Sequence, residues 1–278
     1  MDHQDVRRRN QTHYDAHAVR VPTEKERRAG PAAPLKRFHN DVKRALLQKF
    51  VPPGARLLDL GAGRGGDVRK WADCGVAFAK GLDLSAAELD EARRRAAAVP
   101  GLTAVFEPTD ALGLREWTDP DGPYDVVTCM FALHYFFARE GMCHTLLRHV
   151  ARNLKPGGVF VGIVPDGIRI NRALAAAGTA TGSLVLEAHW SGPPRPFGSA
   201  YVCSIEDTVT DRGGSLEYLV YDTVLTSVAR QVGLSPVVDL ALAGVETSET
   251  TFKHLVPPYD GPLADASRLF AAFAFRKV

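Results

Sequence analysis

The chain has 278 residues and a formal net charge of +2, with 45% hydrophobic and 24% charged residues. These values are ordinary for a globular protein and exclude a collagen-like or low-complexity chain. No apolar run approaches the ~18 residues that a membrane-spanning helix needs, and no apolar stretch follows the N-terminal charges. We therefore expect an intracellular protein, in the nucleus or cytoplasm, without a membrane partner.

Residues 1–34 lack helical or strand periodicity and contain many arginines and three prolines. We interpret them as a basic, flexible N-terminal arm, which is either a solvated tail or a patch that attracts phosphates. From Leu35 to Leu47, apolar residues recur at helical spacing until Pro52 stops the helix. We expect one folded domain over residues 35–278.

The rest of the chain alternates strand and helix patterns. Short apolar runs predict strands at 56–60, 76–84, 103–106, 124–131, 159–164, 237–242 and 270–275. Helical patterns fall at 66–74, 85–99, 140–154 and 221–232, and Ser85 with Glu88 forms a capping-box signature at the second of these. This order predicts an α/β fold with a doubly wound, mostly parallel seven-stranded sheet and helices on both faces. The glycine- and proline-rich stretch at about 178–216 is expected to be an insertion that carries function.

A glycine loop follows the first strand of this sheet. Gly61, Gly63 and Gly66 form a G-x-G-x-x-G pattern between a predicted strand and a predicted helix, where glycines allow a tight turn and close approach of a nucleotide. Asp83 ends the next strand, where a carboxylate can accept hydrogen bonds from both ribose hydroxyls of an adenosine.

Dinucleotides and S-adenosylmethionine both fit a loop of this kind. Asp59 precedes the first glycine, where a carboxylate can bind the ammonium of an amino acid moiety rather than a pyrophosphate. Asp110 follows the third strand and can accept a hydrogen bond from an adenine amino group. The turn LKPGG at 154–158 resembles one common in Rossmann-like methyltransferases. These features favour S-adenosylmethionine over a dinucleotide, and over a Rossmann domain that binds no cofactor.

Several further motifs indicate which family of methyltransferases the sequence resembles. They are LKRFHNDVK at 35–43, HYD at 13–15, LLDLGAGRGGDVRKW at 57–71, MFALHYFF at 130–137, FGSAY at 197–201 and LEYLVY at 216–221. Together they resemble the mRNA cap guanine-N7 methyltransferases over roughly residues 35–276. The resemblance implies a Rossmann-like class I methyltransferase fold, in which the insertion helps to bind the cap.

The resemblance also implies a set of site residues. The cofactor pocket would be lined by Lys43, Asp59, Gly61, Gly63, Asp83, Asp110, Met130 and Tyr135. The cap and its phosphates would contact His39, Asn40, Arg64, Lys70, Arg95, His134, Glu217 and Phe270. Methyl transfer would convert S-adenosylmethionine to S-adenosylhomocysteine, and no metal is expected.

Guanine N7 already has a free lone pair, so this reaction needs no acid/base residue, and catalysis rests on positioning by His134, Tyr135 and Glu217. Glu217 can accept hydrogen bonds from guanine N1–H and N2–H₂, and His134 can donate to O6. Alternatively, Glu217 is a surface carboxylate, His134 a core histidine and Arg95 part of a solvated helix face.

The sequence departs from the family at three of these positions. Met130 replaces a Gln, Phe270 a Tyr and His39 an Asn. Each change removes or moves a polar contact, at about 1 kcal/mol for a neutral hydrogen bond, so we expect it to alter affinity more than reaction type.

The resemblance further implies capped RNA as the partner. Triphosphatase and guanylyltransferase activities, and any activating subunit, would come from other proteins. Two alternative functions remain open. One is a non-catalytic paralogue that binds the cap or a capping enzyme, and the other is a methyltransferase for another small or nucleobase acceptor.

Overall fold

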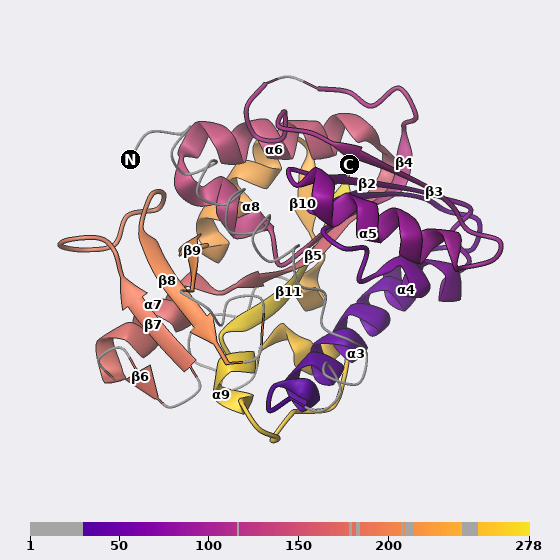
Figure 1. Cartoon of the computed structure of the whole chain (residues 1–278). Helices are drawn as coiled ribbons and strands as arrows, with labels where there is room; N and C mark the ends of the chain where they lie inside the picture. The colour runs from indigo at the N-terminus through magenta and orange to yellow at the C-terminus, as the bar shows by residue number, and fades with distance from the viewer. Residues whose placement is uncertain are drawn as a thin grey trace.

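The computed structural model describes residues 30–115, 117–177, 180–181, 184–206, 208, 214–240 and 250–278. Two β-sheets organise this part of the chain, a seven-stranded sheet and a four-stranded sheet that lies at the left of Figure 1. The HYD segment at 13–15 and nearly all of the expected arm lie outside the described residues. No helix in the described ranges is both long enough and apolar enough to cross a membrane.

The large sheet has the spatial order β10-β11-β5-β4-β1-β2-β3. Its strands are β1 (Arg56–Leu60), β2 (Phe78–Asp83), β3 (Thr103–Pro108), β4 (Tyr124–Met130), β5 (Leu154–Pro165), β10 (Leu234–Pro236) and β11 (Phe270–Lys277). The first five run parallel, whereas β11 is antiparallel to both β5 and β10. The predicted mostly parallel, seven-stranded sheet is confirmed.

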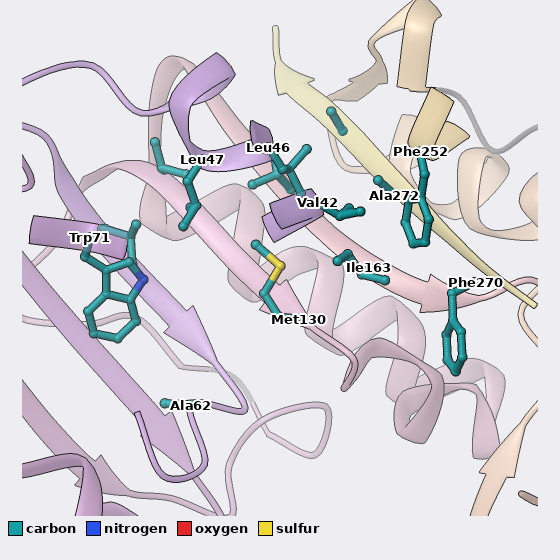
Figure 2. Close-up of a cluster of buried hydrophobic side chains, with 14 of the residues drawn as sticks. Val42, Leu46, Leu47, Ala62, Trp71, Met130, Ile163, Phe252, Phe270 and Ala272 are labelled. Carbon is teal, nitrogen blue, oxygen red and sulfur yellow. The ribbon is translucent and has the colours of Figure 1, made fainter. Parts of the chain in front are cut away.

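Helices cover both faces of this sheet. Helices α3 (Ala33–Phe50), α4 (Val68–Asp73) and α5 (Ala86–Ala97) pack on one face, and α6 (Glu140–Asn153) and α8 (Asp222–Gln231) pack on the other. Because successive strand residues point to opposite faces, neighbours such as Leu57 and Leu58 join different apolar clusters. Figure 2 shows the first cluster, in which Val42 of α3, Trp71 of α4 and Met130 of β4 lie together.

Helix α3 begins at Ala33, two residues before the expected start. Pro34 lies in its first turn. Proline is tolerated there because the N–H group it lacks has no intrahelical partner at that position. Pro34, which was assigned to the N-terminal arm, therefore belongs to the first turn of the helix.

The expected strand at 237–242 is displaced. Helix α8 ends before Gly233, which has a φ of +78°, and the chain enters β10 at once. Residues Val238–Leu240 form the 3₁₀ helix η2 instead. The glycine turn brings the strand forward, because it reverses the chain directly onto the C-terminal strand β11.

The segment between β5 and α8 contains structure that the sequence analysis did not predict. Helix α7 (Gly167–Ala177) starts after Asp166, whose carboxylate accepts hydrogen bonds from the backbone N–H groups of Ile168 and Arg169. The four-stranded antiparallel sheet follows, with strands β6 (Ala180–Thr181), β7 (Leu184–Ala188), β8 (Ala200–Ile205) and β9 (Ser215–Tyr218). The remaining elements are the 3₁₀ helices η1 (Leu133–Ala138) and η3 (Thr251–His254) and the short helix α9 (Ala264–Ser267).

Candidate functional site

The predicted cofactor residues gather at the carboxyl edge of the large sheet. The strands β1, β2 and β4 are parallel, so Asp59, Asp83 and Met130 at or near their ends reach the same edge. The central strand β1 places Asp59 opposite Thr128 of β4. Ligands of open α/β sheets bind at this edge, so the sheet itself defines where the site lies.

The first glycine of the loop is required by its backbone and its surroundings. Gly61 has a φ of +80°, and a Cβ atom built on it would lie 2.7 Å from the Cβ of Ala132. Its N–H donates to the carbonyl of Leu82 at the end of β2. The loop therefore turns sharply against the β4–η1 connection, and a side chain at position 61 would push the two segments apart.

The last required glycine of the loop is Gly65, not Gly66 as the G-x-G-x-x-G pattern predicted. Gly65 has a φ of +67°, and a Cβ there would lie 3.0 Å from the Cα and Cβ of Ala92 on α5. A Cβ on Gly66 would meet nothing within 4 Å. Helix α5 approaches the loop one residue earlier than the pattern suggested, which sequence spacing alone could not reveal.

Asp59 is a buried carboxylate at the end of β1. The hydroxyl of Thr128 donates to its Oδ1 at 2.6 Å. Burial raises the pKa of Asp59 to about 7, and the nearby Asp67 carboxylate adds to the rise. A positive group beside Asp59 would offset this cost, so the position suits the ammonium of an amino acid moiety.

Asp83 orders the turn after β2. Its Oδ2 accepts from the N–H of Gly63 at 2.8 Å and its Oδ1 accepts from the N–H of Ser85 at 2.9 Å. These bonds hold the plane of the carboxylate in a fixed orientation, and a carboxylate is the kind of acceptor that a ribose diol needs. Asp110, in the loop after β3, is half-buried and forms an ion pair with Arg115 at 2.6 Å.

Two lysines share one carboxylate beside the glycine loop. Lys43 on α3 and Lys70 on α4 each lie 2.8 Å from a different oxygen of Asp67. Burial alone would raise the pKa of Asp67, but the two lysines outweigh it and lower the pKa to about 2. The structure thus places Lys70 in a buried ion pair, although the resemblance assigned it to the phosphates of the cap.

The two arginines that were predicted to bind phosphates are also paired with carboxylates of the chain. Arg64 donates from Nε to both carboxylate oxygens of Glu88, at 2.8 and 2.9 Å. Ser85 caps α5 as predicted, but the Glu88 side chain pairs with Arg64 rather than completing the capping box. Arg95 lies on the same helix and pairs with Glu91 at 2.7 Å.

The other half of the site contains His134 and Glu217. His134 lies on η1 and Glu217 on β9, with 3.9 Å between His134 Nε2 and Glu217 Oε1. Both side chains are buried, at 2% and 5% exposure. Neither ring nitrogen of His134 has a hydrogen-bond partner among the described residues. Such an unsatisfied buried group fits a site that a ligand completes.

Burial sets the charge of this pair. It lowers the pKa of His134 to about 3, so the imidazole is neutral at pH 7. It raises the pKa of Glu217 to about 7, against the hydrogen bond from Tyr201, which lowers it. Tyr135, also on η1, makes a 2.9 Å hydrogen bond to Ser215 of β9. Together these contacts fix η1 against the second sheet.

An aromatic cluster joins α3 to β11. The ring centroid of Phe131 lies 5.3 Å from that of His39 and 5.2 Å from that of Phe270. Phe131 has a left-handed φ of +61°, a strained conformation for a bulky residue. His39 contacts Ser267 at 3.1 Å, whereas Asn40 is exposed and donates to the carbonyl of Lys36.

Four residues with contacts at the site are absent from the predicted set, namely Phe131, Tyr201, Asp67 and Glu88, although the motifs quoted for the family contain the first three. No group of three or more His, Cys, Asp or Glu side chains suited to a metal ion occurs within the ranges that the structure describes.

Solved structures with the same architecture include proteins described as S-adenosylmethionine dependent methyltransferases, from Mesorhizobium loti and Listeria monocytogenes. A protein of Pyrococcus horikoshii is 16% identical, covers 92% of this chain and all of its own, and has a TM-score of 0.57. The N-methyltransferase NodS of Bradyrhizobium japonicum, in complex with S-adenosyl-L-homocysteine, is 13% identical, with coverage of 96% and 97% and a TM-score of 0.55. These likenesses confirm the expected fold.

Curated relatives are mRNA cap guanine-N(7) methyltransferases. The enzyme of Schizosaccharomyces pombe is 29% identical over 91% of this chain and 78% of its own. "mRNA cap guanine-N(7) methyltransferase 1" of Oryza sativa is 32% identical over 73% of this chain, and the enzyme of Saccharomyces cerevisiae is 29% identical over 80%. The matched regions span only 59% and 55% of the rice and Saccharomyces cerevisiae proteins. A family model described as "mRNA (guanine-N(7))-methyltransferase domain" matches residues 2–253. The chain therefore belongs to the mRNA (guanine-N(7))-methyltransferase family.

Proposed function

We propose that this chain transfers a methyl group from S-adenosylmethionine to N7 of the guanine that caps the 5′ end of RNA. The observation that carries the proposal is the buried pair of Glu217 and neutral His134 at the carboxyl edge of the sheet. A buried carboxylate and a buried imidazole without a partner suit a planar ligand that offers donors and an acceptor, as the guanine edge does.

The residues of the cofactor half fit S-adenosylmethionine. When bound, this cofactor supplies a methyl group activated by a sulfonium. Asp59 has the buried, desolvated carboxylate that an ammonium would neutralise, and Asp83 is held by two backbone N–H groups in a position to accept from a ribose diol. Asp110 would accept from the adenine amino group. The wall would be completed by Lys43, Gly61, Gly63, Met130 and Tyr135.

On the acceptor side, each residue has a distinct task. Glu217 accepts from guanine N1–H and N2–H₂, and His134 donates to O6 from one ring nitrogen because it is neutral. Phe270 offers an aromatic face near His39, with which it is in edge contact at 5.6 Å. Arg64, Lys70, Arg95 and Asn40 would contribute positive charge and hydrogen bonds toward the phosphates.

The ion pairs of the cations bear on this last assignment. Arg64, Lys70 and Arg95 each pair with a carboxylate of the chain, so a triphosphate would meet charges that are already partly neutralised. We therefore assign them to weak attraction of the phosphates, and the guanine contacts to recognition.

The chemistry asks little of the side chains beyond alignment. Guanine N7 has a free lone pair, so no residue has to remove a proton. His134, Tyr135 and Glu217 position the base so that N7 faces the methyl carbon in line with the sulfur, an effect that can contribute ~7–11 kcal/mol. The low-dielectric, largely buried setting strengthens each of these hydrogen bonds.

The partner in this proposal is RNA with a GpppN end. Other proteins supply triphosphatase and guanylyltransferase activity, and an activating subunit is compatible with it. The protein acts inside the cell, in the nucleus if the source is a cellular eukaryote. Residues 1–34 act as an arm before the methyltransferase domain at 35–278, with the insertion at about 178–216 beside the cap. Deleting the arm is expected to weaken RNA binding at low salt more than at high salt.

The test is a methyl-transfer assay with purified protein, S-adenosylmethionine and GpppA, with analysis of the product for 7-methylguanine. Wild-type protein is expected to form it, and Glu217→Gln to lose most of this activity. Glu187→Gln is the matched control, because Glu187 is an exposed glutamate on β7 of the same sheet. Binding of S-adenosylhomocysteine without formation of 7-methylguanine from GpppA or capped RNA would point to the non-catalytic or other-acceptor alternatives.

A further inference from the structure

Tyr201 lies behind Glu217 in the second sheet. It is 0% exposed and belongs to β8, where it is the register partner of Glu217 on β9. Directly opposed residues of an antiparallel pair project to the same face. The Tyr201 hydroxyl accordingly reaches the carboxylate and donates to Oε2 at 2.6 Å, so it is in a position to fix the orientation of the carboxylate.

The two strands present an ordered row of polar groups to η1. Ser215 and Glu217 are two residues apart on β9 and share a face, where Ser215 contacts Tyr135 at 2.9 Å and Glu217 faces His134 at 3.9 Å. The bond from Tyr201 uses one lone pair of the far oxygen of Glu217, Oε2, and leaves its second lone pair for a guanine donor. The oxygen nearer to His134, Oε1, is thereby turned toward the place proposed for the guanine.

We propose that Tyr201 is a positioning residue that holds the Glu217 carboxylate as a hydrogen-bond acceptor and so determines the preference for guanine. This inference rests on the proposed function. An ionised carboxylate only accepts hydrogen bonds, which matches the N1–H and N2–H₂ donors of guanine. A protonated Glu217 would present a donor as well and lose that match. The Tyr201 hydroxyl donates to the carboxylate and therefore favours the form that recognises guanine.

Among the groups around Glu217, Tyr201 is the main one that favours the ionised carboxylate. His134 faces Glu217 from η1, Tyr201 and Cys203 face it from β8, and Tyr135 of η1 interacts with Tyr201. His134 is neutral and the Cys203 thiol remains protonated, because burial lowers the pKa of the first and raises that of the second. Burial raises the pKa of Glu217 to about 7, and the Tyr201 hydrogen bond is the interaction that lowers it. Removing the hydroxyl is therefore expected to shift the titration of Glu217 further upward.

The test compares wild-type protein with Tyr201→Phe, which removes only the hydroxyl. The Glu217 carboxyl is titrated by carbon-13 NMR, and GpppA affinity is measured by calorimetry between pH 6 and 8.5 with S-adenosylhomocysteine present. We expect the Glu217 pKa of the variant to be higher by about one unit. Its GpppA affinity is expected to fall by about tenfold at pH 6.5 and to recover partly toward pH 8.5.

Two comparisons separate positioning from a general loss of stability. Tyr124→Phe removes another buried tyrosine hydroxyl, at the end of β4 that lies about 20 Å of strand away from Met130. This variant is expected to leave the Glu217 pKa and the pH dependence of GpppA affinity unchanged. An inosine-capped analogue lacks the N2 donors, and Tyr201→Phe is expected to narrow the preference for the guanine cap over it.

The outcomes distinguish this inference from the proposed function. An unchanged Glu217 pKa in Tyr201→Phe, or a loss of affinity that is the same at every pH, would overturn the role of Tyr201 while wild-type methylation stands. If wild-type protein binds S-adenosylhomocysteine but not GpppA, the proposed function fails, and with it the guanine preference assigned to Tyr201. The NMR titration still reports on the Tyr201–Glu217 pair in that case.

Discussion

The two halves of the carboxyl edge differ in how far the protein satisfies its own polar groups. In the cofactor half, Asp67 is bound by two lysines, and Asp83 accepts two backbone hydrogen bonds. The acceptor half is the part around His134 and Glu217 that we propose binds the guanine. Among the described residues, neither buried ring nitrogen of His134 has a hydrogen-bond partner, and the buried Glu217 has one hydrogen bond, from Tyr201.

This difference separates polar groups that stabilise the fold around the site from polar groups that a ligand would satisfy. Paired charges stabilise the loop between β1 and α4, and removing one partner would leave the other buried and unpaired. Unsatisfied or desolvated groups do the opposite, because they cost folding free energy until a ligand completes them. Asp59 is the exception in the cofactor half, since its desolvated carboxylate behaves like Glu217.

The largest effect is expected from a substitution that breaks the ion pairs of the cofactor half. Asp67→Ala leaves the buried Lys70 beside the half-buried Lys43 without their shared carboxylate, and we expect it to destabilise the fold by about 3–5 kcal/mol in urea unfolding. Asp73→Ala is the matched control, because Asp73 is an exposed residue at the end of α4, the helix that Asp67 precedes, and its ion pair among the described residues is a 3.9 Å contact with Arg44. Equal stability of the two variants would contradict the distinction drawn between the halves.

A second prediction concerns the acceptor half, where loss of charge should stabilise the protein. The raised pKa of Glu217 means that the folded state binds its proton more tightly than the unfolded state. Its contribution to stability is therefore present below the ordinary pKa near 4.5 and is lost as the pH rises through about 7. We expect Glu217→Gln to be more stable than wild type at pH 8 by on the order of 1–3 kcal/mol, and about equal to it at pH 4.5.

Thermal unfolding at the two pH values measures this difference, and the same variant is expected to bind GpppA ten- to a hundredfold more weakly. A Glu217→Gln protein that is less stable than wild type at pH 8 would show that the carboxylate supports the fold rather than ligand recognition. Glu187→Gln, with its exposed side chain, again serves as the control.

The glycine loop offers a third comparison, between adjacent positions. Gly65→Ala forces a Cβ against Ala92 at a positive φ, so we expect a loss of about 1–3 kcal/mol in stability. Gly66→Ala meets open space at an ordinary φ and should change stability by less than about 0.5 kcal/mol. The reverse order in urea unfolding would restore Gly66 as the required glycine.

The smallest effect is expected from a substitution that tests the hydrogen bond between η1 and β9. Ser215→Ala removes the hydrogen bond to Tyr135, which is expected to cost about 1 kcal/mol and to weaken S-adenosylhomocysteine binding severalfold. Calorimetry with Thr226→Ala as control tests it, since within the described part of the chain the Thr226 hydroxyl donates to Asp222 of the same helix, α8. Unchanged cofactor affinity would place Tyr135 outside the cofactor pocket.

Much of the fold was predictable because its strands and helices carry periodic apolar patterns. Strand β1 has the predicted bounds, and β2, β3 and β4 lie within two residues of theirs at both ends. Helix α7 and the second sheet were not predicted, because their local signals are a single capping aspartate and short strands between glycines and prolines. Such strands are specified by pairing with each other rather than by local sequence.

The site was predictable to the extent that chemistry follows strand ends and family motifs. The parallel strands bring Asp59 and Asp83 to one edge of the sheet, and His134 lies 3.9 Å from Glu217, while their roles in binding stay predictions. The partners of the basic residues were not predictable, because Arg64 meets a glutamate 24 positions away and Lys43 an aspartate at the same separation.

The sequence by itself determined the class of fold, the family and the edge of the sheet at which the candidate site lies, because strand periodicity, glycine spacing and family motifs are local. Only the tertiary structure decided which glycine is required, which cations are already neutralised and which buried groups still lack a partner. Those properties depend on what a side chain meets across the fold, where a neighbour 3 Å away can be many residues distant along the chain.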